Sequence, residues 1–198
     1  MQDSTSLNQL PPSTTVPSKN PISMILTMMM NPKAAIESGL SHFPWFVSLL
    51  ISSLAFGTFF IQTGLDLYKT GQEPLTYVLI QLVLGLAFGA IVIPLIGLLI
   101  WPIIRLKKGT LKLTESISLA CLSYGATLIY GIVGLCFSLL LGWKTALAFG
   151  ATGVLWSLGP LMISLRTATK GDTVLAVVLT TLVGAAILFA WQALQYIS

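Results

Sequence analysis

The sequence predicts an all-α membrane protein: a bundle of five transmembrane helices preceded by a short amphipathic cytoplasmic helix. Five long segments contain no Asp, Glu, Lys or Arg, and they cover residues 43–65, 74–104, 116–143, 145–165 and 173–198. One helix needs about 20 apolar residues to cross the hydrocarbon core of a bilayer. The composition agrees, because 8% of the residues are charged, whereas soluble domains contain about 25%.

The N-terminal part is predicted to form a polar tail followed by an interfacial lead-in. Residues 1–21 are rich in Ser, Thr, Asn and Pro. They have too little apolar surface to offset the entropy of ordering, so we predict a disordered tail without a signal peptide. Residues 22–42 form the lead-in, whose apolar run 22–30 is too short to span and is expected to lie along the membrane surface. Asn31 and Pro32 then mark a helix start, with Asn31 as the N-cap.

Residues 43–198 form the predicted membrane domain, with spans over about 45–65, 75–101, 117–141, 146–165 and 174–196. Pro94 is expected to kink the second span, and Asp172 is a suitable N-cap for the fifth. Cys121 and Cys136 lie in the third span, roughly 22 Å apart at about 1.5 Å per residue. That separation is too large for a disulfide.

The basic residues predict an orientation. Lys and Arg are enriched in cytoplasmic loops next to membrane helices. With these spans, two basic residues fall on one side, Lys69 and Lys144. Eight fall on the N-terminal side: Lys19, Lys33, Arg105, Lys107, Lys108, Lys112, Arg166 and Lys170. We therefore expect a cytoplasmic N-terminus and a C-terminus outside.

Small residues recur at four-residue spacing within the spans, which lets helix backbones approach closely. They are candidates either for packing within one chain or for a dimerisation face: Gly85, Gly89, Ser123, Thr127, Gly131, Ala176, Thr180 and Gly184.

Polar side chains within the spans are few. Gln62, Gln81, Gln192 and Gln195 lie toward the outer half of their helices. Gln81, together with Tyr124 and Tyr130, is a candidate for lining a polar cavity, and interhelical hydrogen bonding is the alternative role for such groups.

The loop with Arg105, Lys107, Lys108 and Lys112 is the densest charge cluster of the chain. It suits contact with an anionic leaflet or a partner protein, and simple topology is the alternative explanation. No catalytic residue, cofactor or metal site is expected, because His42 is the only histidine and no catalytic or phosphate-binding motif occurs. Nucleic-acid binding is not expected, since it needs an extended basic face.

Several local patterns resemble the bacterial branch of the Yip domain family. They are the run from Asn31-Pro32-Lys33 to Glu37, the basic loop Lys107-Lys108-Gly109, and the step Ser123-Tyr124-Gly125. A polar turn over 167–172 then leads into a fifth span rich in small residues. The resemblance implies a five-span protein of the bacterial cytoplasmic membrane. The Asp-Leu-Tyr-Gly-Pro signature of eukaryotic members is not in the sequence, so binding of Rab-type GTPases is not expected.

These observations favour a non-enzymatic membrane protein that organises membrane or scaffolds partners through helix packing and its basic loop. Its expected partners are lipids and a further membrane protein or a second copy of itself. The alternative is a small-molecule permease or a channel component.

Overall fold

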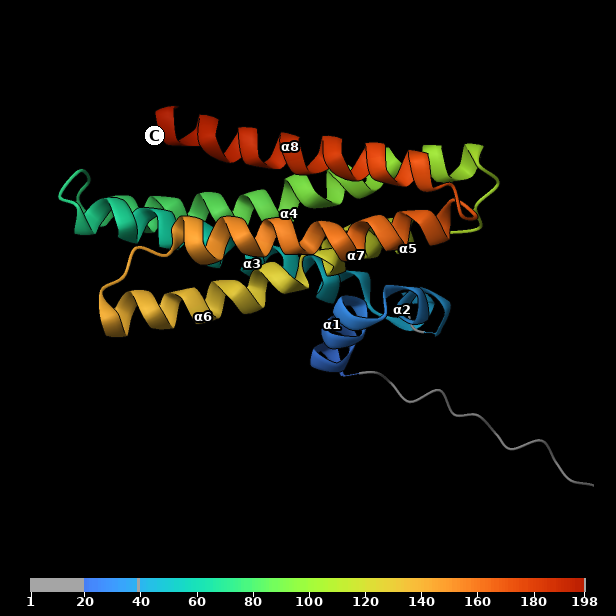
Figure 1. The fold of residues 1–198 in the computed structure, drawn as a ribbon, viewed down its shortest axis with the longest axis horizontal. Helices are drawn as coiled ribbons and strands as arrows, with labels where there is room; N and C mark the ends of the chain where they lie inside the picture. Colours follow the sequence, from blue (N-terminus) through green and yellow to red (C-terminus); the bar gives the residue numbers. More distant parts are fainter. Residues whose placement is uncertain (1–19, 39, 198) are drawn as a thin grey trace, which may run out of the picture.

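The computed structural model describes residues 20–38 and 40–197, and all regular elements in these ranges are helical (Figure 1). Most of the predicted tail, residues 1–19, lies outside them. In chain order the elements are α1 (Pro21–Met30), α2 (Pro32–Ser38), η1 (Leu40–His42), α3 (Trp45–Lys69), α4 (Leu75–Leu106), α5 (Leu113–Ser123), α6 (Gly125–Leu141), η2 (Ala146–Ala151), α7 (Thr152–Ala168) and α8 (Thr173–Ile197).

The five predicted spans are confirmed as helices that are long and apolar enough to cross a membrane. They cover residues 45–69, 75–106, 113–141, 146–168 and 173–194. The first, second and fourth run three to five residues past their predicted ends, because helices continue into the headgroup region, where Lys and Arg side chains are tolerated. The second span, α4, stays helical through both Pro94 and Pro102.

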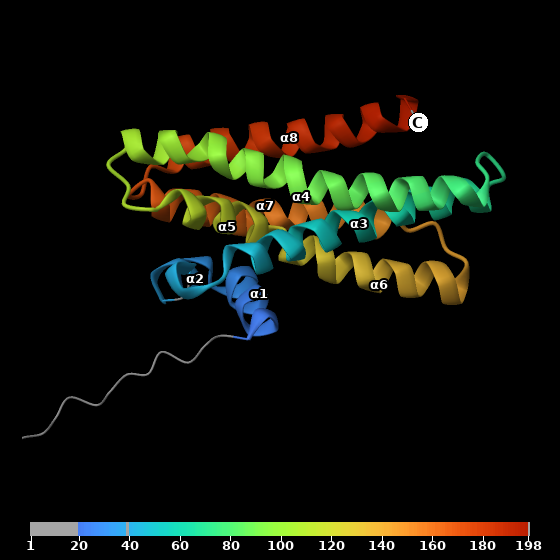
Figure 2. The same ribbon diagram turned by 180° about the vertical axis from the view of Figure 1, so that it is seen from behind.

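The first span, α3, is the central helix of the bundle. It packs against α4, α5, α6 and η2, and 56% of its most apolar stretch is buried, against 22% for α8. Both ribbon views show α8 along one side of the bundle (Figures 1 and 2). The centre of the protein is therefore built around α3, and α8 presents most of its surface to the surroundings.

The third span was predicted as one continuous helix, but it breaks at Tyr124 into α5 and α6. The break fits the packing of the N-terminal lead-in. A Cβ on Gly125 would lie 2.8 Å from Cγ2 of Ile25, so α1 fills the hollow where α5 and α6 change direction. The following span opens with a π-helical turn, η2, where Gly150 lies directly against the ring of Phe59.

The lead-in is docked into the bundle more deeply than a segment lying along a surface. Met24, Ile25 and Met28 of α1 are buried between α5, α6 and α7, while Ile22 and Met30 are exposed. In both ribbon views α1 runs across the long axis of the bundle (Figures 1 and 2). The predicted start of α2 is confirmed, because Oδ1 of Asn31 accepts a hydrogen bond from the backbone N–H of Ala34 at 3.1 Å.

The loops fall at two ends. The basic end carries the lead-in, the α4–α5 loop and the α7–α8 loop, and an ion pair of 2.9 Å between Lys107 and Asp172 joins those two loops. The opposite end carries the α3–α4 turn and the α6–η2 loop, with the C-terminal end of α8 (Figure 1). All basic residues of the described ranges except Lys69 and Lys144 therefore share one end. Which side of a membrane that end faces remains a prediction.

Candidate functional site

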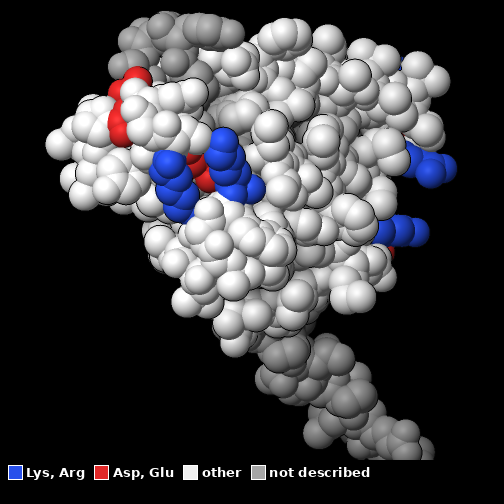
Figure 3. Space-filling model, turned by 60° about the vertical axis from the view of Figure 1, so that its left-hand side comes forward, with Lys and Arg blue, Asp and Glu red and all other residues white. Residues whose placement is uncertain are grey.

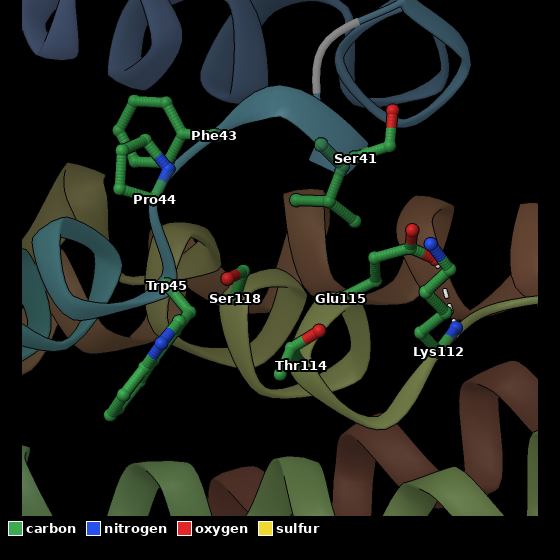
Figure 4. Close-up of a pocket in the computed structure, with 9 residues that line it drawn as sticks. Ser41, Phe43, Pro44, Trp45, Lys112, Thr114, Glu115 and Ser118 are labelled. Atoms are coloured by element: carbon green, nitrogen blue, oxygen red, sulfur yellow. Dashed lines mark hydrogen bonds between the residues drawn. The ribbon is translucent and has the colours of Figure 1, made fainter.

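The lead-in and the start of α5 enclose a crevice at the basic end. Its volume is about 280 Å³. Figure 4 shows Ser41 of the lead-in and Phe43, just after it, above Thr114 and Glu115 of α5. A carboxylate oxygen of Glu115 accepts a hydrogen bond of 2.9 Å from the backbone N–H of Lys112. This contact satisfies one of the free N–H groups that every helix start presents. The carboxylate of Glu115 is therefore already engaged in capping α5.

The predicted basic loop divides into tethered and outward-facing side chains. The guanidinium of Arg105 lies 5.5 Å from the ring centroid of Trp101, and Lys107 pairs with Asp172. Lys108 and Lys112 are exposed. The pKa of Asp172 lies below its ordinary value. The main cause is the hydrogen bond that Lys107 donates to its carboxylate, and the second is the bond from the backbone N–H of Leu175. The 3.0 Å bond from Leu175 also confirms Asp172 as the predicted N-cap of α8.

The predicted small-residue positions on α4 and α6 pack within the chain. A Cβ on Gly85 would lie 2.7 Å from Cβ of Phe60, and one on Gly89 would lie 2.6 Å from Cα of Ser53, both on α3. A Cβ on Gly131 would lie 2.8 Å from Cβ of Thr58. These three glycines therefore let α4 and α6 approach the central helix, and they are covered by it.

The other small-residue candidates are also inside the bundle. Oγ1 of Thr127 and Oγ of Ser157 lie 2.9 Å apart, which joins α6 to α7. A Cβ on Gly184 would lie 2.6 Å from the side chain of Leu158 on α7. The remaining three candidates are buried: Ser123, Ala176 and Thr180. All eight positions thus contribute to packing inside one chain.

The three candidates for a polar cavity have different neighbours. Nε2 of Gln81 donates a 2.6 Å hydrogen bond to the hydroxyl of Tyr77 near the start of α4. Tyr124 is fully buried, with its ring 5.3 Å from that of Phe56. Tyr130 is half-buried, and its ring is 6.3 Å from that of Trp156 on α7. The Gln81 bond lies within α4, whereas the rings of Tyr124 and Tyr130 contact aromatic rings of α3 and α7.

The other glutamines predicted near this cavity have separate environments. Nε2 of Gln62 donates a hydrogen bond of 2.9 Å to the carbonyl of Gly131, which joins α3 to α6. Gln192 is exposed at the opposite end. The side chains of Gln195 and His42 lie outside the described part of the chain.

The opposite end holds a charged tether that sequence reasoning did not identify. The two carboxylate oxygens of Asp66 accept hydrogen bonds from the backbone N–H groups of Thr145 and Ala146, at 3.1 and 2.8 Å. Nζ of Lys69 donates to the carbonyl and the hydroxyl of Ser138, at 2.6 Å each. A carboxylate at a helix start and an ammonium group at a helix end both complement the helix dipole. The last turn of α3 therefore holds the α6–η2 loop from both sides.

A hollow of about 580 Å³ lies beside this tether, with Asp66, Glu73 and Lys144 among its lining residues. Figure 3 brings this end forward and shows basic side chains flanking acidic atoms, with other charged side chains toward the edges of the view. Nε1 of Trp191 donates to Oγ1 of Thr63 at 3.2 Å, and both residues line the hollow. In the sequence, the only sign of this tether is that Asp66 and Lys69 follow the first charge-free segment. Neighbouring residues do not indicate which loop these two side chains will bind.

No protein-family model, curated protein or solved structure matches this chain.

Proposed function

We propose that this chain is a non-enzymatic integral membrane protein that organises membrane or gathers partner proteins at its basic end. The filled centre of the bundle supports this most. The rings of Phe56, Phe60, Phe88 and Tyr124 contact one another with centroids 5.0 to 5.6 Å apart, and each of these side chains is at most 6% exposed. A bundle closed by aromatic rings between its ends favours work done on its outer surfaces over passage through the middle.

The basic end is the better candidate for that surface. At the opposite end, Lys69 is engaged inside the protein, because its Nζ donates hydrogen bonds to Ser138 of α6. At the basic end Lys108 and Lys112 are exposed, and each basic residue near an anionic leaflet adds about 1 kcal/mol of attraction. We propose that this end faces the cytoplasm, as the distribution of basic residues predicts.

We further propose that the chain is of the bacterial Yip type. Two of the quoted patterns have defined structural roles that support a shared architecture: Asn31 caps α2, and the step at Tyr124 separates α5 from α6. On this proposal the protein resides in the cytoplasmic membrane and acts without a Rab-type GTPase.

Proximity labelling tests the proposal. A biotin ligase is fused to the N-terminus, and the labelled proteins are compared between the wild type, the double variant Lys108→Gln/Lys112→Gln and the control Lys144→Gln. We expect a defined set of neighbours that is lost in the double variant and kept in the control, because Lys144 lies at the opposite end. An identical labelled set in all three would contradict the basic end as the interaction surface.

A small-molecule permease or channel component is the second candidate, and the hollow of about 580 Å³ at the opposite end favours it. Trp191 lines this hollow and connects it to the centre of the bundle, because its ring centroid lies 5.0 Å from that of the buried Phe59. Solute flux into proteoliposomes decides between the two functions. The scaffold proposal expects no flux in the wild type or in Trp191→Ala. Flux by the wild type that Trp191→Ala alters would replace that proposal with a permease.

A further inference from the structure

Two adjoining hollows follow α7 from the basic end toward the middle of the bundle. The polar hollow, of about 510 Å³, lies between α2 and the end of α7, and its lining includes Lys33, Glu37, Arg166 and Lys170. The apolar groove, of about 420 Å³, continues along α7 past Trp156 and Gly159 and is bounded on its other side by Met29, Met30 and Pro32. Ile163 lines both hollows, so they adjoin at this residue.

The polar hollow has the charge of an anion site. Three of its lining side chains are basic and one is acidic. The acidic one, Glu37, lies 3.9 Å from Nζ of Lys33, and both are more than half exposed, so this pair is a weak one. Arg166 and Lys170 are exposed and come from the last turn of α7 and the residues just after it. A guanidinium binds the oxygens of a phosphate group through two parallel hydrogen bonds.

Lys170 is held in an unusual backbone conformation, with φ of +57°. The helix end around it is a Schellman motif, in which the backbone N–H of Gly171 donates to the carbonyl of Arg166 at 2.8 Å. Glycine is the favoured residue at such a left-handed position, and another residue costs about 1 kcal/mol there. Glycine would relieve this backbone strain, so the backbone conformation does not by itself explain the lysine, which also lines the polar hollow.

The two hollows together have the length of a headgroup and one acyl chain. The segment from Trp156 of the apolar groove to Arg166 of the polar hollow is helical throughout, so it rises about 15 Å at roughly 1.5 Å per residue. That is half of the roughly 30 Å hydrocarbon core, the depth of one leaflet. The groove is open beside Gly159, because a Cβ there would meet no heavy atom within 4 Å.

We propose that α2 and α7 form a binding site for one anionic phospholipid. Its phosphate is held by Lys33, Arg166 and Lys170, and one acyl chain lies in the groove beside Gly159 and Trp156. Charge complementarity selects the headgroup, and the apolar groove that adjoins the polar hollow at Ile163 selects a molecule with an anion attached to an apolar chain. This site lies at the same basic end as the proposed scaffold function but uses none of the residues of the basic loop, so the variants that test the two do not overlap.

The test measures lipid binding by native mass spectrometry of the delipidated full-length protein in detergent, titrated with phosphatidylglycerol or phosphatidylcholine. We expect one phosphatidylglycerol to bind more tightly than phosphatidylcholine. The triple variant Lys33→Gln/Arg166→Gln/Lys170→Gln should weaken phosphatidylglycerol binding about 100-fold, since each basic side chain near a lipid surface contributes about fivefold. Equal binding of the two lipids by the wild type would overturn the proposal.

Two matched controls separate a site from general attraction. The variant Lys107→Gln/Lys108→Gln/Lys112→Gln removes as many charges from the same end, and it should change phosphatidylglycerol binding less than threefold. If this variant weakens phosphatidylglycerol binding as much as the site variant does, the lipid is attracted by the whole basic end, and the proposal of a defined site is wrong.

Gly159→Leu fills the groove, whereas Gly159→Ala, with the same demand on the backbone before Pro160, leaves it open. We expect the leucine variant to bind phosphatidylglycerol at least tenfold more weakly than the alanine variant. Equal binding would show that no chain lies in the groove. Far-UV circular dichroism of each variant confirms that the comparison is between folded proteins.

Lys170→Gly gives a readout that a structural role alone would not produce. Relief of the left-handed position should raise the melting temperature, while loss of the cation weakens phosphatidylglycerol binding about fivefold. A stabilised variant with unchanged binding would remove Lys170 from the site.

Discussion

Replacement of Gly89 by alanine should destabilise the bundle, because α3 and α4 cross there with no room for a side chain. An added Cβ would lie 2.6 Å from Cα of Ser53 and 2.7 Å from the carbonyl carbon of Ser52, and it would overlap the carbonyl oxygen of Ser52. These neighbours are backbone atoms, so no rotamer change can relieve the contact. The two helices would have to separate by roughly 1 Å to restore ordinary van der Waals distances.

Two hydrogen bonds depend on the same close approach. Oγ of Ser52 donates to the carbonyl of Gly89 at 2.7 Å, and Oγ of Ser53 donates to the carbonyl of Leu86 at 2.9 Å. Bonds of this kind between membrane helices contribute about 0.6 kcal/mol each. Overpacking typically costs about 1–3 kcal/mol, and the higher helix propensity of alanine returns up to about 1 kcal/mol. The expected net loss of stability for Gly89→Ala is therefore about 2 kcal/mol.

The assay is reversible unfolding of the purified protein in mixed micelles with rising SDS, followed by far-UV circular dichroism. Gly159→Ala is the matched control, because its Cβ would meet no neighbour. Pro160 offsets part of the gain in helix propensity there, so its stability should change by less than about 0.5 kcal/mol. If Gly89→Ala unfolds at the wild-type SDS concentration, or dissociates a dimer while the monomer stays equally stable, the packing argument is refuted.

Three further predictions use the same unfolding assay. Asp66→Ala removes the acceptor for two backbone N–H groups and should cost about 1–2 kcal/mol, whereas a wild-type midpoint would show that the tether does not stabilise the fold. Lys108→Gly should gain about 1 kcal/mol, because Lys108 has a φ of +59° in a second Schellman motif; no gain would show that its backbone is unstrained. The lowered pKa of Asp172 means that its stabilisation is present above the unfolded-state pKa of about 3.9 and is lost as the pH falls through the lower folded-state value. The wild type should therefore lose more stability than Asp172→Asn, which keeps an N-cap side chain, between pH 5 and pH 2, and parallel losses would contradict this.

The features that could be predicted from the sequence are those that depend on neighbouring residues in the chain. Charge-free length predicts a span without reference to any partner, and all five spans are found. The N-caps Asn31 and Asp172 were predictable because a cap bonds to a backbone group three residues away. The grouping of basic residues at one end follows directly from the number of spans between them.

The features that could not be predicted depend on contacts between distant segments. The break at Tyr124 accompanies the approach of Ile25 to Gly125, about a hundred positions apart. The tether at Asp66 joins α3 to a loop that follows two further spans. The predicted small-residue ridges on α4 and α6 lie against α3, but periodicity cannot say whether the partner helix belongs to the same chain.

The two ends of the bundle use their charges in different ways, and this difference supports a surface function for the basic end. At the opposite end Asp66 and Lys69 turn inward to satisfy the ends of neighbouring helices. At the basic end two helices finish in Schellman motifs, and in both the left-handed position holds a lysine, Lys108 or Lys170, with the glycine one residue later. Exchanging each lysine for glycine would leave the motif's hydrogen bonds intact and remove about 1 kcal/mol of backbone strain. A strained residue that the fold does not require indicates a role for its side chain, and an exposed ammonium group at a membrane surface has anionic headgroups as its nearest partners.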